Sequence, residues 1–222
     1  MRIILAVLPI LILTTCARAP RPSVSTPPGV AAPQAATIAT CKYCPVSISN
    51  RASSAFGVPN GQQPNGCKTG LSNGFLLPDP GCTPGAENPT VTLDILRSPA
   101  FRTGCIRNCV TTDSQKQVTY GWYGIPSPTN NTGDNQTCEL DHLVPLELGG
   151  ADTLDNIWPQ CGPAGVSLKD RYFKQKDLVE NYLTRQVKSG AMDLEEARHQ
   201  IATDWTPFLA AAKQNLITSN RP

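Results

Sequence analysis

The residues of this chain best suited to chemistry fall within residues 138–160. Asp141 and His142 stand side by side there, and Asn156 follows them after a break at Gly149-Gly150. The pKa of an imidazole lies near neutrality, so a histidine can take a proton from water at physiological pH. A carboxylate is a hard oxygen ligand that suits Mg²⁺ or a similar ion. The stretch therefore offers a candidate base next to a candidate cation ligand.

Two short strands are expected to position these groups. Residues 139–145 alternate acidic and apolar side chains, which predicts a strand with one solvent-facing side that reaches at least Pro145. Residues 156–158 predict a second strand that Pro159 stops. Gly149-Gly150 and the polar residues after them predict a wide connection. The whole stretch is predicted to be a hairpin with the candidate chemistry at its tip.

One register for this hairpin predicts a disulfide. If His142 stands opposite Ile157, antiparallel pairing keeps the sum of the two residue numbers constant along the strands. Cys138 then faces Cys161 at the open end. We predict a disulfide between these two cysteines, one of up to four bridges that eight cysteines allow once Cys16 is set aside.

The same residues resemble the HNH nuclease motif. Asp141-His142, Pro145-Leu146, Gly149-Gly150 and Asn156 carry the resemblance. More widely, DHLVPLELGG with NIWPQ, and later KDLVENYL and IATDW, is similar to a set of bacterial HNH-type proteins over residues 91–205. The resemblance implies an α+β fold with a ββα-metal (His-Me finger) core, additional helices and a disulfide-rich, loop-built N-terminal lobe. It also implies an exported, metal-dependent endonuclease that hydrolyses phosphodiester bonds of DNA, with RNA as an alternative substrate.

The resemblance implies a role for each residue of the motif. His142 would act as the general base that takes a proton from water, and Asp141 would hold one divalent ion. That ion is Mg²⁺ in the first place, with Mn²⁺, Ni²⁺ or Zn²⁺ as alternatives. Asn156 would not touch the phosphate, and its amide would tie the wide loop and so aim His142. Glu139 shares a strand face with Asp141, so it is expected to support Asp141 or replace it as a ligand.

A helix packed across the hairpin would supply a further metal ligand. Similarity to the KD and EN residues of these proteins makes Asp177, Glu180 and Asn181 the candidates, and the choice among them stays open. Where the family often has a histidine and a cysteine, this chain has Thr184 and Lys188. A histidine-rich metal site is therefore in doubt.

Residues 167–189 predict this helix, since apolar side chains recur at near-helical spacing from an N-cap at Ser167 to a stop at Gly190. The segment also carries a cluster of basic residues. Two interpretations explain this cluster equally well: contact with nucleic-acid phosphates, or a solvated helix face. The candidate phosphate contacts are Lys169, Arg171, Lys174, Lys176 and Arg185. A formal net charge of +2 does not by itself indicate a polyanion partner.

The flanking segments predict further short elements. Residues 91–97 are expected to form a short helix or strand, and residues 113–124 a helix that becomes irregular towards its end, with its aromatic residues in the core rather than stacked on bases. Asp193 is expected to begin a helix, and Thr206-Pro207 another, with Thr206 as N-cap. His199 is expected to be a surface histidine.

The N-terminus predicts export. Residues 1–15 have the short basic start and apolar run of an export signal. Residues 13–16 resemble a bacterial lipobox, which implies lipidation of Cys16, whereas cleavage a little further on would give a secreted protein. Residues 16–40 predict a disordered tether rich in Pro and Ala. We therefore expect a periplasmic or cell-envelope lipoprotein, or else a secreted protein, that meets a membrane only through a lipid at Cys16.

The rest of the chain predicts one globular domain, residues 41–222. Residues 41–90 would form the Cys-rich lobe, and residues 91–222 the nuclease region with its core at 138–189. The CxxC of residues 41–44 is interpreted as part of structural disulfides, with half of a zinc site or a redox pair as the alternatives. A rival to the nuclease hypothesis is a non-catalytic cell-envelope lipoprotein that keeps a degenerate HNH fold to bind a partner or a metal.

Overall fold

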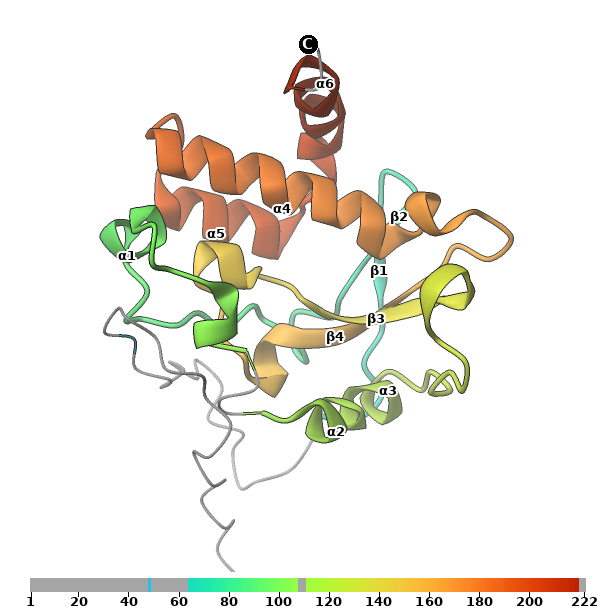
Figure 1. Ribbon diagram of the computed structural model, residues 1–222. Coiled ribbons are helices and arrows are strands. Elements are labelled where there is room, and N and C mark those ends of the chain that lie inside the picture. Colours follow the sequence, from blue (N-terminus) through green and yellow to red (C-terminus); the bar gives the residue numbers. More distant parts are fainter. Residues whose placement is uncertain (1–47, 49–63, 108–110, 220–222) are drawn as a thin grey trace, which may run out of the picture. The chain divides into compact units, whose positions relative to one another are not determined.

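The computed structural model describes residues 48, 64–107 and 111–219 (Figure 1). The predictions for the export signal, the tether, Cys16 and residues 41–44 lie outside this part of the chain. The described residues combine helices with two small antiparallel sheets, so the predicted α+β class is confirmed. None of the described helices is long and apolar enough to cross a membrane.

The predicted hairpin is a two-stranded antiparallel ribbon. It consists of β3, Cys138–His142, and β4, Ile157–Cys161. His142 pairs with Ile157, and Cys138 pairs with Cys161 and is disulfide-bonded to it. Both the predicted register and the predicted disulfide are therefore confirmed.

Pro159 does not stop the second strand, contrary to the prediction. It lies within β4, opposite Leu140. The N–H of Leu143 donates to the carbonyl of Asn156 over 2.8 Å, and hydrogen-bonded pairs alternate with non-hydrogen-bonded pairs along an antiparallel ribbon. Leu140 and Pro159 therefore form a non-hydrogen-bonded pair. A proline without an N–H costs no ladder hydrogen bond there, so the strand continues through it.

The wide connection depends on two glycines. β3 ends at His142 rather than at Pro145, and the chain turns into the 3₁₀ helix η4, Leu146–Leu148. Gly149 ends this turn with φ of 79°, a conformation that glycine adopts without penalty. A Cβ on Gly150 would lie 1.8 Å from the carbonyl oxygen of Val144. The glycine pair therefore lets the loop fold back closely against the end of β3.

The segment predicted to be built of loops contains a second hairpin. In it β1, Gly70–Ser72, pairs with β2, Phe75–Leu77. A disulfide joins Cys67 to Cys82. Strands of three residues are too short to show an alternating pattern, and for that reason the sequence did not predict them.

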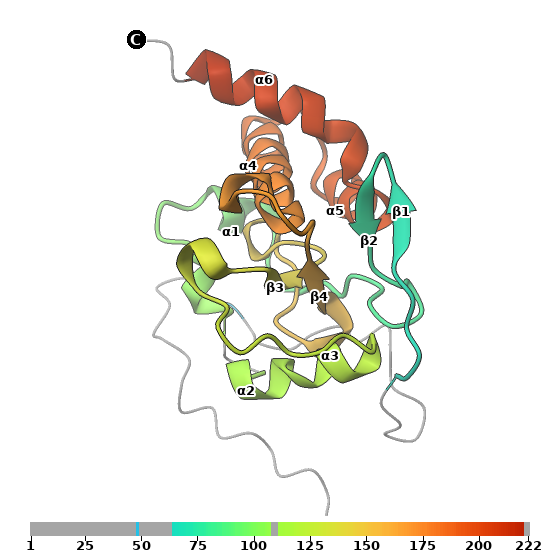
Figure 2. The same ribbon diagram turned by 90° about the vertical axis from the view of Figure 1, so that its right-hand side faces the viewer.

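This hairpin lies beside α5, Leu194–Thr203, and the residues that follow it (Figure 2). Ser72 Oγ donates to Asp204 Oδ2 over 2.6 Å. The Phe75 ring packs edge-on against Trp205 with centroids 5.0 Å apart. The two contacts fasten the hairpin to the helical part of the fold.

One face of the ribbon is covered by α4, Tyr172–Ser189 (Figure 1). The predicted helix is confirmed, but its predicted N-cap is wrong: α4 begins at Tyr172, and Ser167 precedes a separate 3₁₀ turn and makes no capping hydrogen bond. The helices α1, Leu93–Arg97, α5 and α6, Leu209–Ser219, pack with α4 around the main apolar core. The α4 residues Val179, Leu183 and Val187 are fully buried in this core. Burial of such side chains contributes roughly 1.5–3 kcal/mol each, so α4 is fixed firmly over the ribbon.

Of the two other predicted N-caps, one is confirmed and one is wrong. The Asp193 carboxylate accepts hydrogen bonds from the N–H groups of Glu195 and Glu196, so its role as N-cap of α5 is confirmed. Thr206 is not the cap of the last helix. It is the first residue of a 3₁₀ turn, η7, Thr206–Phe208, which leads into α6.

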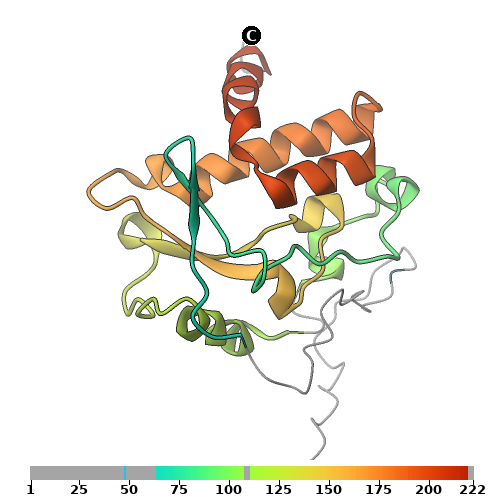
Figure 3. The same cartoon turned by 180° about the vertical axis from the view of Figure 1, so that it is seen from behind.

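The other face of the ribbon is covered by α2, Asp113–Lys116, and α3, Val118–Trp122 (Figures 1 and 3). Trp122 and Tyr123 are buried against Trp158 of β4. The prediction that the aromatic residues of this segment belong to the core is confirmed. The remaining 3₁₀ turns are η2, Thr103–Cys105, η3, Gly133–Asn135, η5, Leu154–Asn156, and η6, Leu168–Asp170.

Candidate active site

Asp141 and His142 contact opposite sides of the fold. Successive side chains of a strand point to opposite faces, so two neighbours in β3 cannot share one. The Asp141 carboxylate meets Lys176 of α4, and the His142 imidazole meets Asp152, which also binds Lys116 of α2. The candidate site therefore has an α4 side and an α2 side, joined through the backbone of β3.

On the α2 side, His142 is held by a buried carboxylate. His142 Nε2 lies 2.8 Å from Asp152 Oδ1, and Lys116 Nζ lies 2.9 Å from the same oxygen. His142, Asp152 and Lys116 are 6%, 1% and 3% exposed, respectively. Buried charges persist when they are paired and hydrogen-bonded, and here Lys116 supplies the positive charge that Asp152 needs.

This environment keeps the imidazole neutral. Burial lowers the pKa of His142 from its ordinary value, the hydrogen bond and charge of Asp152 oppose that shift, and the positive charges of Arg107 and Lys116 add to it. Burial by itself would raise the pKa of Asp152, but the hydrogen bonds from His142 and Lys116 outweigh it and the net shift is downward. At neutral pH the pair is therefore a neutral imidazole next to a carboxylate.

On the α4 side, three oxygen atoms surround the ammonium group of Lys176. Nζ lies 2.8 Å from Asp141 Oδ2 and 2.5 Å from Glu180 Oε1, and it donates to the carbonyl oxygen of His142 over 2.8 Å. The Lys176 side chain has no exposed surface. Lys176 thus binds two of the predicted metal ligands and the backbone of the predicted base.

Two carboxyl groups share this one ammonium, so they have one positive charge between them. Burial raises the pKa of Asp141 to about 6 and that of Glu180 to about 8, in each case against the opposing charge of Lys176. The pKa of Lys176 is raised, because the two carboxylates outweigh its burial. The protons of such a coupled group belong to the group as a whole, and the raised pKa values mean that the group holds a proton near neutral pH.

The other candidate ligands lie at the edge of this group. Glu139 is 3.6 Å from Lys174, which also binds Asp177 over 2.8 Å. Burial raises the pKa of Glu139, with a further contribution from the charge of Asp177. Asn181 is exposed, and its Nδ2 donates to the carbonyl of Asp177 within α4.

The donor chemistry suits a divalent ion, but the side chains as they lie do not form its site. Asp141 and Glu180 provide hard oxygens of the kind that Mg²⁺ binds. The position between them is taken by Lys176 Nζ. In the part of the chain that the structure describes, no three His, Cys, Asp or Glu side chains are grouped so that they could hold a metal. The ribbon and α4 have the order of a ββα unit, whereas a metal centre in it stays a prediction.

Asn156 makes the hydrogen bonds predicted for it. Its Oδ1 accepts from the N–H of Val144 over 2.9 Å, and its Nδ2 donates to the carbonyls of Val144 and Ala151 over 2.9 and 2.8 Å. Asn156 is fully buried. Its amide thus links Val144, two residues after His142, to Ala151, the residue before Asp152.

The five basic candidates do not form one surface. Lys176 is buried in the ion group, and Arg171 is 7% exposed and donates to the carbonyl of Pro163. Lys174 is partly exposed and paired with acidic side chains. Lys169 and Arg185 are exposed. Lys169 and Arg185 are thus the members with a side chain directed to solvent.

The sequence did not single out Asp152, Lys116 or Arg107. Asp152 follows the glycine pair closely, so its place in the loop beside the motif was a signal that could have been used. Lys116 and Arg107 precede the motif by many residues. Lys116 reaches Asp152 only through the packing of α2, and Arg107 acts on His142 through its charge. No short-range pattern points to such contacts.

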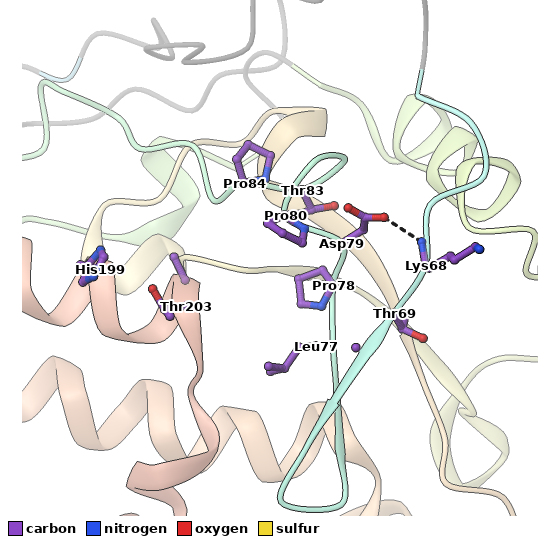
Figure 4. A pocket seen from close by; sticks show the side chains of 12 residues that line it. Lys68, Thr69, Leu77, Pro78, Asp79, Pro80, Thr83, Pro84, His199 and Thr203 are labelled. Carbon is purple, nitrogen blue, oxygen red and sulfur yellow. Dashed lines mark hydrogen bonds between the residues drawn. The ribbon is translucent and has the colours of Figure 1, made fainter.

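The second histidine lies elsewhere. His199 of α5 lines a cavity of about 620 Å³ together with residues of the β1–β2 segment, among them Lys68, Asp79 and Thr83 (Figure 4). His199 is exposed, as predicted. Among the described residues, those that line this cavity make no hydrogen bond or ion pair with His142, so His199 is a natural control for variants of His142.

Comparison with known proteins gives no relative: no family model, curated protein or solved structure matches this chain.

Proposed function

We propose that this protein is a hydrolase of phosphodiester bonds, an HNH-type endonuclease acting on DNA, with RNA as an alternative substrate. The observation that carries the proposal is the position of His142. It stands at the end of β3 and is fixed on one side by Asp152 and on the other by the loop that Asn156 ties. That arrangement, together with the HNH-like residue pattern, supports a general base at this point.

In the proposed reaction, His142 takes a proton from water as the water attacks phosphorus. The bond from phosphorus to the leaving sugar oxygen breaks, and that oxygen takes a proton from solvent. A neutral imidazole is needed for this step, and the lowered pKa of His142 favours it. Protonated His142 would then be stabilised by the Asp152 carboxylate, which lies 2.8 Å from it. Proton transfer by a well-placed base contributes roughly 10²–10⁴-fold to a rate.

We also propose one divalent ion, Mg²⁺ in the first place, bound by Asp141 and Glu180. A bound ion would offset the negative charge that develops on the phosphate oxygens. The close placing of two carboxyl groups around one cation supports this proposal. It requires the Lys176 ammonium to give up its place between the two carboxylates, because both now bind it.

The two described disulfide pairs indicate an oxidising environment, extracellular or periplasmic. We propose that the N-terminal residues direct export and that Cys16 carries a lipid. Exposed Lys169 and Arg185 are proposed to contact nucleic-acid phosphates.

The buried Lys176 specifically favours a second candidate function. A site whose cation is already supplied by the chain is what a degenerate, non-catalytic HNH fold would have. In that case the protein would be an envelope lipoprotein that binds a partner. Activity assays separate the two candidates.

The test is the cutting of supercoiled plasmid DNA and of a labelled RNA, with Mg²⁺ and with a chelator. His142→Gln keeps an N–H donor for Asp152 but has no basic nitrogen, so it removes the base with little disturbance of the loop. His199→Gln is the matched control. We expect the wild type and His199→Gln to cut with Mg²⁺, and His142→Gln to be slower by roughly 10²–10⁴-fold. Absence of cutting by the wild type under all conditions would support the non-catalytic candidate, and equal cutting by both variants would exclude His142 as the base.

A further inference from the structure

We infer that Asp152 and Lys116 are positioning residues that hold His142 in one tautomer, with the proton on Nε2, and so present Nδ1 as the basic nitrogen. This inference rests on the proposed function for its catalytic meaning. The geometry that supports it is independent of that function.

The first step is the direction of the hydrogen bond between His142 and Asp152. An ionised carboxylate accepts hydrogen bonds and cannot donate them. Nε2 lies 2.8 Å from Asp152 Oδ1, so Nε2 must be the donor. A neutral imidazole has one N–H, and therefore its other nitrogen, Nδ1, carries a lone pair. Among the described residues, Nδ1 has no hydrogen-bond partner that would compete for this lone pair.

The second step is the part played by Lys116. Asp152 is 1% exposed, and a carboxylate so deeply buried takes up a proton unless a positive charge stabilises its ionised form. A protonated Asp152 could donate to Nε2, which would place the imidazole proton on Nδ1 and leave no base there. Lys116 Nζ, 2.9 Å from the same oxygen, prevents this by keeping Asp152 ionised.

The third step is how the sequence brings Lys116 to this place. Lys116 is the last residue of α2, whose start is fixed by a capping box between Thr112 and Gln115. Thr119 of α3 donates to the carbonyl of Lys116 over 2.8 Å. A single helical turn, fastened at both ends, thus delivers one ammonium group to the loop next to His142.

The experiment reads the tautomer directly. The chain has two histidines, so long-range ¹H–¹⁵N spectra of ¹⁵N-histidine-labelled protein contain two imidazoles, and the exposed His199 serves as internal reference. At neutral pH we expect His142 to have a protonated Nε2 and an unprotonated Nδ1. A protonated Nδ1 in the wild type would overturn the inference by itself, whether or not any variant folds.

Variants then connect the tautomer to activity. In Asp152→Asn the side-chain amide can donate to Nε2, so we expect the imidazole proton to move to Nδ1 and kcat to fall by roughly 10²–10⁴-fold with KM little changed. Asp152→Glu should restore the Nε2 proton and part of the rate. Lys116→Gln should weaken the tautomer preference, and Lys116→Arg should retain it.

The outcomes separate this inference from the proposed function. If Asp152→Asn loses activity while His142 keeps its proton on Nε2, Asp152 has a merely structural role and the inference is wrong. If the wild type cuts neither DNA nor RNA, the proposed function fails, but the spectra still decide which nitrogen carries the proton.

Discussion

The buried side-chain amide of Asn156 makes three hydrogen bonds that fix the conformation of the loop next to His142. Asn156 uses its carbonyl oxygen as an acceptor and its NH₂ group as a double donor, all towards backbone groups. A buried polar atom that loses its partner costs roughly 1–3 kcal/mol. The side chain at this position must therefore provide both kinds of group, which asparagine does and aspartate does not.

We expect Asn156→Asp to lower the free energy of unfolding by about 2–4 kcal/mol, because the carbonyls of Val144 and Ala151 lose their donor and a charge is buried. Urea denaturation measures this. The matched control is Asn135→Asp, at an exposed position, where we expect a change within about 0.5 kcal/mol. Losses of similar size in both variants would contradict the role given to Asn156.

The group formed by Asp141, Lys176 and Glu180 predicts a pH effect on stability. The pKa of Glu180 is raised from its ordinary value to about 8, chiefly by burial, so the folded protein holds this proton more tightly than the unfolded chain does. The contribution of Glu180 to stability is therefore present at low pH and lost as pH rises from about 4.5 through about 8. Glutamine cannot titrate, so as pH rises from 5 to 8 the free energy of unfolding of Glu180→Gln should increase relative to that of the wild type.

Urea denaturation at both pH values checks this sign. Glu195→Gln is the control, because its side chain is 70% exposed, and we expect no such trend for it. If the difference between wild type and Glu180→Gln stays constant over this range, the Glu180 carboxyl does not hold its proton in the folded protein.

At the scale of the elements, the two ends of the ribbon are held in different ways. A disulfide joins the strands at one end, and hydrogen bonds hold His142 at the other. Cys138 and Cys161 are 23 residues apart in sequence, and a cross-link over such a loop stabilises a fold by about 3 kcal/mol. His142 lies at the other end of β3 and is held by its own contacts.

We therefore expect the double variant Cys138→Ala, Cys161→Ala to lose about 3 kcal/mol of unfolding free energy and still to show the imidazole signals of wild-type His142. Denaturation and the ¹⁵N spectra check the two halves of this expectation. A shifted His142 signal would mean that the disulfide, and not the local contacts alone, determines how the imidazole is held.

The ribbon and its cover were largely predictable from the sequence. Alternation, the paired residue numbers and the glycine pair predicted the β3–β4 hairpin with its register, and apolar spacing predicted α4. The prediction for Pro159 was wrong because its effect depends on which pairs are hydrogen-bonded, and that follows from the register rather than from the proline itself.

The candidate site was less predictable, because its contacts link distant segments. The spacing of four residues within a helix predicts the contact of Lys176 with Glu180, but only the packing of α4 on β3 brings Lys176 to Asp141. Lys116 reaches the site from the other face. Spacing along the chain indicates which residues share an element, but it does not show which buried charges will be paired across elements.

For the whole molecule, the ribbon lies between two helical layers, and charged side chains are paired differently on its two sides. The α4 side pairs the carboxylates Asp141 and Glu180 with one lysine, and the α2 side pairs Asp152 with both Lys116 and His142. One face of β3 thus carries two carboxyl groups that share one ammonium, and the other carries a neutral imidazole with its carboxylate. If the proposed function holds, a divalent ion would bind on the α4 side and proton transfer would take place on the α2 side.

The most direct test of the central claim is the rate of 4-nitrophenol release from bis(4-nitrophenyl) phosphate, a simple phosphodiester, by wild type, His142→Gln and His199→Gln measured side by side with Mg²⁺. The account predicts hydrolysis by the wild type and the His199 variant at similar rates, and a rate at least about 100-fold lower for His142→Gln. Equal rates for the two variants, or no hydrolysis above background by the wild type, would contradict it.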